Sequence, residues 1–123
     1  MTTWITICDT CKREGWDAGS GKTDGEALAE LIEPIAAATD AIKTRRVSCM
    51  MGCDRACNIA IQGDEKLAYV LGTFEPNADD AQAIVDYAAA YEDSETGQVP
   101  YRQWPQGLKG HFTSRTVPLP KTD

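Results

Sequence analysis

The chain is poor in positive charge and lacks the features that mark several other protein classes. Its 123 residues contain 12 Lys and Arg against 19 Asp and Glu, which gives a net charge of −7. Nucleic acids and anionic membranes select clustered positive charge, so we expect neither as the main partner. No apolar run approaches a membrane span, and the N-terminus lacks the basic stretch and long apolar core of a signal peptide. We therefore expect a cytoplasmic protein.

Cysteine, by contrast, is abundant. A domain of this length can build a core without disulfides, which are rare in the cytoplasm. The chain nevertheless has five cysteines, an odd number that cannot all be paired within it. They form two groups in the sequence, Cys8 with Cys11, and Cys49 with Cys53 and Cys57. Such grouping favours a site over scattered buried thiols.

Four short β-rich segments are predicted from residue type and alternation. The first has apolar side chains on both faces, so we expect it to be covered on both sides. The last two are separated by Gly63-Asp64, a turn signal that predicts an antiparallel hairpin. The predicted strands span residues 4–8, 43–48, 58–62 and 67–71.

Two helices are predicted between and after these strands. Thr23 and Glu26 have the spacing of a capping box, which predicts the start of a helix that kinks or ends near Pro34. Asn77 is a good N-cap for the second helix. The order is therefore β-α-β-β-β-α, with the first two strands parallel. This order predicts an α/β thioredoxin-like fold with a four-stranded mixed sheet.

The regular pattern stops after the second helix, so we expect a domain over residues 1–93 and an extended tail over residues 94–123. The tail contains four of the six prolines. Its aromatic residues, Tyr101, Trp104 and Phe112, indicate that part of it packs on the domain or on a second subunit. A homodimer is therefore one expected assembly.

The two cysteine groups are expected to meet in space, because the C-terminal ends of neighbouring parallel strands lie side by side. Convergent thiolates suit an iron–sulfur cluster, which tolerates loose ligand spacing. Zinc stays open as an alternative, since it commonly takes two close cysteine pairs. A thiol–disulfide oxidoreductase is a third hypothesis, because Cys8 and Cys11 form a C-x-x-C motif after a strand. The sequence shows no general acid, general base or substrate pocket, so we do not expect an enzyme. His111 lies in the tail, and we expect it to take no part in the site unless the tail folds back.

Residues 49–61, followed by Gly63, a strand and an acidic helix, resemble the second half of thioredoxin-like 2Fe–2S ferredoxins. The resemblance implies that Cys49 and Cys53 are two cluster ligands and that Cys8 is the first. The family's second ligand falls where this chain has Gly19-Ser20-Gly21. Cys11 and Cys57 are the candidates to replace it.

The whole chain more closely resembles the small predicted metal-binding proteins grouped as domain of unknown function 1636. All five cysteines fall on that family's pattern. Cys57 lies where thioredoxin-like folds often carry a proline facing the active loop, so it should lie near the others. The resemblance implies a 2Fe–2S protein that transfers single electrons to a partner protein or has a redox accessory role, with a link to cobalamin or metal metabolism. A metal-handling protein for zinc or cobalt is the alternative. The cofactor site is predicted to comprise Cys8, Cys11, Cys49, Cys53 and Cys57, with four ligating at a time.

Overall fold

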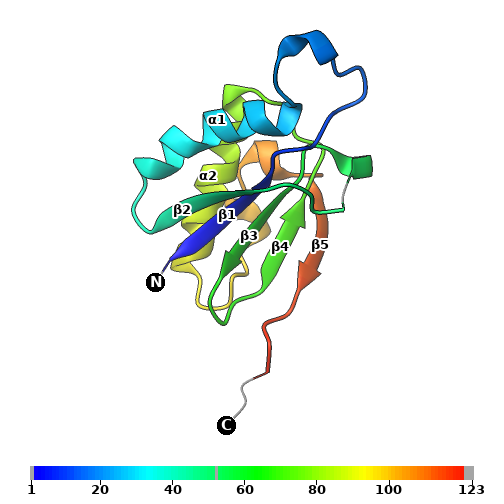
Figure 1. Ribbon diagram of the computed structural model, residues 1–123. Helices are drawn as coiled ribbons and strands as arrows, with labels where there is room; N and C mark the ends of the chain where they lie inside the picture. Colours follow the sequence, from blue (N-terminus) through cyan, green and yellow to red (C-terminus); the bar gives the residue numbers. More distant parts are fainter. Residues whose placement is uncertain (1, 52, 121–123) are drawn as a thin grey trace.

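The computed structural model describes residues 2–51 and 53–120, which form two α-helices and a five-stranded sheet. Figure 1 shows these elements arranged in two layers. In chain order they are β1 (Thr3–Cys8), α1 (Asp24–Ala37), β2 (Ile42–Val47), β3 (Ile59–Gly63), β4 (Ala68–Leu71), α2 (Ala78–Asp93) and β5 (Phe112–Thr116).

The sheet has the strand order β2-β1-β3-β4-β5. β1 and β2 are parallel, and the other pairs are antiparallel. The predicted α/β thioredoxin-like fold and its β-α-β-β-β-α core are confirmed. The predicted count of four strands is wrong by one, because Phe112–Thr116 of the predicted tail pairs with β4 as an edge strand. That segment has only one large apolar residue, so it carries little strand signal.

Both helices begin at the predicted caps. The Thr23 hydroxyl accepts a hydrogen bond from the Glu26 backbone N–H at 3.0 Å, and the Glu26 carboxylate accepts one from the Thr23 N–H at 3.0 Å. Asn77 accepts from the Asp80 N–H at 2.8 Å. Pro34 lies in the last turn of α1, where its missing N–H removes only one helical hydrogen bond. Among the residues that the structure describes, no helix is long and apolar enough to cross a membrane.

The core lies between the sheet and the helices, which pack on the same face of the sheet (Figure 1). Ile5 and Ile7 of β1 and Ile59 and Ile61 of β3 point into this core and are fully buried. The expectation that β1 is covered on both faces holds only in part, since Thr6 on the second face is 4% exposed but Trp4 is not buried. Its alternate residues face away from the helices, and Trp4 there remains 38% exposed.

The segment after α2 packs back on the domain. The Phe112 ring lies 5.5 Å from the Tyr69 ring and 4.5 Å from the Trp104 ring. Leu108 is fully buried, whereas Tyr101 is exposed. Two of the three aromatic residues singled out in the sequence therefore contact the domain itself.

Candidate cysteine site

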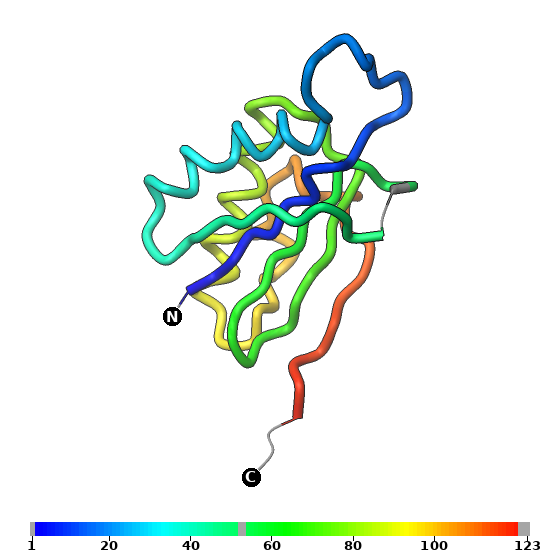
Figure 2. Tube along the Cα trace, in the orientation of Figure 1, coloured from blue at the N-terminus to red at the C-terminus, as the bar shows by residue number. Residues whose placement is uncertain are grey.

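The cysteine-bearing segments converge at one end of the sheet (Figure 2). β1 and β2 end there because they are parallel, and β3 begins there because it is antiparallel to β1. The Cys8 N–H donates to the carbonyl of Asn58 at 3.1 Å. The N–H of the next residue, Asp9, donates to the carbonyl of Val47 at 2.9 Å. The end of β1 is thus hydrogen-bonded on one side to the residue that follows the second cysteine group and on the other side to β2, which precedes that group.

Three of the predicted site cysteines are buried together. Cys8 and Cys11 are each 2% exposed, and Cys57 is fully buried. Cys57 follows Ala56 through a cis peptide bond and donates its N–H to the carbonyl of Phe74 at 3.4 Å. These thiols come from both cysteine groups, which therefore meet in space as the parallel strand pair predicted.

The remaining two cysteines lie on the connection from β2 to β3. Cys49 is exposed, and its Sγ accepts a hydrogen bond from the Met51 N–H at 3.4 Å. Cys53 begins a short 3₁₀ helix, Cys53–Arg55. The Cys53 side chain and Gly52 lie outside the described residues.

Two glycines fix the backbone behind these cysteines. A Cβ atom on Gly25, in the first turn of α1, would lie 2.0 Å from the Cys8 carbonyl oxygen. A Cβ atom on Gly72 would lie 2.4 Å from the Arg55 carbonyl oxygen. Only glycine allows such close backbone approach. The N-terminus of α1 and the end of β4 are therefore packed directly against the two cysteine segments.

The three buried thiols have different acidities. Burial raises the pKa of Cys57 to about 12, with a further contribution from the negative charge of Cys11. Burial also raises the pKa of Cys11 to about 11, although a hydrogen bond from Asn58 opposes it. Burial acts against ionisation of Cys8 too, but hydrogen bonds from Cys11, Thr10 and Met50 outweigh it, and its pKa is lowered. Cys8 is therefore the most readily ionised of the three.

The side chains gathered at this end of the sheet are thiols, the donors that a sulfur-ligated metal group requires. Thiolates are the ligands that zinc and iron–sulfur clusters take, and binding displaces the thiol protons. Within residues 2–51 and 54–120, no three Cys, His, Asp or Glu side chains are grouped so as to hold a single metal ion. The buried thiols of Cys8, Cys11 and Cys57 supply the donor chemistry of such a group from both cysteine segments, without the spacing that holds one ion. Completing four ligands would require Cys49 or Cys53.

Asn58 and His111 also contribute to this end of the fold. The buried Asn58 amide donates to Sγ of Cys11 at 3.2 Å, and its position next to Cys57 was the only signal for it in the sequence. The fold-back that would bring in His111 does occur. Its ring stacks on Phe74 with centroids 4.3 Å apart, and Nδ1 lies 2.8 Å from the Gly72 carbonyl oxygen. His111 thus packs behind the segment that holds Cys57.

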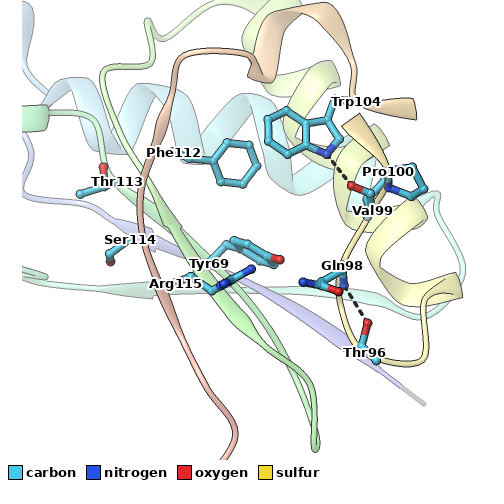
Figure 3. Close-up of a pocket in the computed structure, with 10 residues that line it drawn as sticks. All are labelled: Tyr69, Thr96, Gln98, Val99, Pro100, Trp104, Phe112, Thr113, Ser114 and Arg115. Carbon is cyan, nitrogen blue, oxygen red and sulfur yellow. Dashed lines mark hydrogen bonds between the residues drawn. The ribbon is translucent and has the colours of Figure 1, made fainter. Parts of the chain in front are cut away.

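A cavity lies away from the cysteines. It has a volume of about 760 Å³ and opens between β5 and the segment after α2 (Figure 3). Tyr69, Trp104 and Phe112 form its aromatic walls, and Arg115 also lines it. None of the described cysteines lines it. This cavity and the buried thiols are therefore in different parts of the molecule.

Comparison with known proteins supports the fold and the family. No curated protein matches the chain. A solved thioredoxin-like [2Fe–2S] ferredoxin from Aquifex aeolicus is similar in structure, with a TM-score of 0.57 and 12% sequence identity over 95% of this chain and 94% of that chain. At 12% sequence identity, this structural similarity establishes the fold alone. The family described as protein of unknown function DUF1636 matches residues 5–118, which confirms the predicted family, and the chain belongs to it.

Proposed function

We propose that this protein binds a 2Fe–2S cluster and acts in one-electron transfer or as a redox accessory. The observation that carries the proposal is the burial of Cys8, Cys11 and Cys57 together at one end of a thioredoxin-like sheet. A cluster supplies the one-electron chemistry when bound. The chain supplies thiolates, the Asn58 hydrogen bond and restricted access to water, each of which tunes a cluster's potential.

The proposed ligands are drawn from the five cysteines Cys8, Cys11, Cys49, Cys53 and Cys57, with four ligating at a time. The buried thiols hold the inner side of the site. Cys49 and Cys53, on the β2–β3 connection, are the candidates for the remaining ligands. No role as an enzyme is proposed. We also propose a cytoplasmic location, where thiols stay reduced, and a protein redox partner.

Anaerobic purification followed by a visible spectrum and assays of iron and acid-labile sulfide tests this proposal. A coloured protein with equal amounts of iron and sulfide is the expected result. A protein that contains one zinc or cobalt and no acid-labile sulfide, colourless in the case of zinc, would show a metal-handling protein instead.

Single Cys→Ser variants then rank the ligands. We expect Cys49→Ser and Cys53→Ser to abolish cluster assembly, and Cys11→Ser or Cys57→Ser to leave an altered spectrum. Ser48→Ala is the matched control, because it changes a side chain next to Cys49 without removing a thiol. Equal and complete loss for all five cysteines would contradict the idea of one spare thiol.

A thiol–disulfide function is the second candidate, and one observation favours it. The hydrogen bond between Cys8 and Cys11 contributes to the lowered pKa of Cys8, and a thiolate is the attacking species in disulfide exchange. A metal-free protein in which Cys8 and Cys11 form a reversible disulfide, detected by thiol counting and mass spectrometry, would support this function and contradict the cluster.

A further inference from the structure

Charge is separated between the two layers of the protein. α1 contains four Asp or Glu residues and α2 contains five, and neither helix contains Lys or Arg. Within the described chain, the five strands contain no Asp or Glu and carry the cations Lys43, Arg45, Arg46 and Arg115. The strands of the sheet are thus positively charged, although the chain as a whole has a net charge of −7.

Two of these cations lie on the sheet face that no helix covers. The register pairs Trp4 with Lys43 and Thr6 with Arg45, so these side chains share one face. Arg46 points to the opposite face, where it pairs with Glu33 of α1 at 2.8 Å. We call Trp4, Lys43 and Arg45 the outer-face cluster.

The cations of the outer-face cluster are held in place without being neutralised. Arg45 donates to the Thr6 hydroxyl at 2.7 Å and to the Gln62 carboxamide oxygen at 3.1 Å. The Lys43 ammonium lies 5.8 Å from the centre of the Trp4 ring. Among the described residues, neither cation has a carboxylate within ion-pair distance. Neutral partners fix the guanidinium and leave its charge available.

A hollow of about 270 Å³ adjoins the cluster, and its wall includes Trp4, Arg45 and Gln62 together with one acidic residue, Asp64. A space of this size accommodates a carboxylate side chain with its methylene stem. Tryptophan and arginine are also the residue types most enriched among energetically dominant interface residues. The hollow therefore places the Trp4 ring and the Arg45 guanidinium side by side in a wall that is otherwise mostly polar.

We propose that the outer-face cluster is a docking site for the acidic surface of a partner protein. Carboxylates of the partner pair with Lys43 and Arg45, and Trp4 packs against its apolar surface. Two copies of this chain cannot meet face to face through the cluster without opposing like charges, which argues against a symmetric dimer through this face. Trp4 and Cys8 are four residues apart on β1, about 13 Å at the strand rise, so a partner docked on the cluster lies about that far from the cysteine end. The purpose of docking rests on the proposed electron-transfer function, whereas binding itself needs no cluster.

Titration of the ¹⁵N-labelled full chain with a synthetic peptide of Glu and Leu tests the proposal, with a matched peptide of Gln and Leu as the neutral probe. At low ionic strength we expect the Glu peptide to shift the amide resonances of Trp4, Lys43, Arg45 and Gln62, and added salt to reverse the shifts. The double variant Lys43→Gln/Arg45→Gln should weaken binding roughly tenfold. Arg102→Gln/Lys109→Gln, which removes two cations elsewhere, is the control and should leave binding unchanged.

Equal binding of the two peptides, or unchanged binding in the Lys43→Gln/Arg45→Gln variant, would overturn the proposal. Tighter binding of duplex DNA or of phosphatidylserine vesicles at the same residues would overturn it too, in favour of those ligands. The titration is run on metal-free and iron-reconstituted protein. If iron fails to bind while the Glu peptide still binds, the cluster proposal fails and the docking site stands. If iron binds and the Glu peptide does not, only the docking site is rejected.

Discussion

Nδ2 of Asn58 lies 3.2 Å from Sγ of Cys11 and donates a hydrogen bond to it inside the protein. Asn58 is buried, and it immediately follows Cys57 at the start of β3. The amide therefore joins the two cysteine groups from the interior side. This bond lowers the pKa of Cys11, against the larger effect of burial.

Asn58→Leu should raise the pKa of Cys11 above its present value of about 11, because the hydrogen bond to the thiolate is lost. The variant should also be destabilised by about 1–2 kcal/mol. The ¹³Cβ chemical shift of Cys11, followed against pH in the metal-free protein, measures the first effect. Thr10→Val is the control, since Thr10 contacts Cys8; it should move the Cys8 titration and leave that of Cys11 in place.

The metal-free protein should lose stability as the pH rises from about 9 towards 12. The folded-state pKa values of Cys11 and Cys57, about 11 and about 12, lie above the ordinary value of 9.0, so the unfolded chain releases these protons first. The stabilisation that the neutral thiols provide is complete below pH 9 and is lost as the pH rises towards the folded-state pKa values. Over that range the free energy of unfolding falls by up to about 1.4 kcal/mol per pH unit for each group. Urea denaturation at several pH values measures the slope.

The matched variant for this alkaline effect is Cys57→Ala, which should make the slope shallower. Tyr91, whose pKa burial raises to about 12, remains in both proteins and contributes equally. The same slope in the two proteins would show that Cys57 does not contribute to the alkaline loss.

Gly25→Ala should destabilise the protein by at least about 2 kcal/mol. Alanine favours helices by about 1 kcal/mol over glycine, but the added Cβ would overlap the Cys8 carbonyl. Thermal unfolding measures the change. Gly19→Ala, in an exposed turn where the nearest atom to the added Cβ is a side-chain oxygen at 3.3 Å, should change stability little. Similar effects of the two substitutions would argue against close packing of α1 on β1.

Lys66→Met should cost about 1–3 kcal/mol, although methionine is more apolar. The buried Lys66 ammonium donates to the carbonyls of Tyr91 and Glu92 at 3.0 and 2.9 Å, at the C-terminus of α2. Methionine leaves those carbonyls without this donor. Hydrogen exchange of the last turn of α2 should speed up, whereas Lys12→Met, an exposed control, should leave it unchanged.

Phe112→Ala should destabilise the domain by about 2–4 kcal/mol, because its ring packs on Tyr69, Tyr87 and Trp104. The neighbouring substitution Thr113→Ala affects an exposed side chain and should cost little. Equal, small effects would mean that residues 94–123 behave as a separate tail, as their composition predicts.

The sequence predicted most of the elements that position the cysteines, because those elements carry local signals. The capping box at Thr23 and Glu26, the Asn77 cap and the turn after β3 each depend on residues a few positions apart. β5 could not be predicted in this way. Its partner, β4, lies some 40 residues earlier in the chain, and its own residues are mostly polar and exposed.

The meeting of the two cysteine groups followed from strand direction, but its details did not. Parallel β1 and β2 bring the groups to one end, whereas the burial of Cys57 and the exposure of Cys49 depend on how the connecting loop folds. The need for glycine at Gly25 arises from contact between α1 and β1, which no local pattern encodes. The assignment of ligands among the five cysteines remains a prediction.

The stacking of His111 on Phe74 gives the protein a built-in probe. The chain has a single histidine, so its imidazole produces one isolated set of proton signals in a spectrum of unlabelled protein. Ring stacking makes those signals sensitive to small displacements of Phe74, whose carbonyl is bonded to the N–H of Cys57. Metal loading, oxidation or reduction at the cysteines can therefore be followed in real time from the opposite side of the segment, without a label.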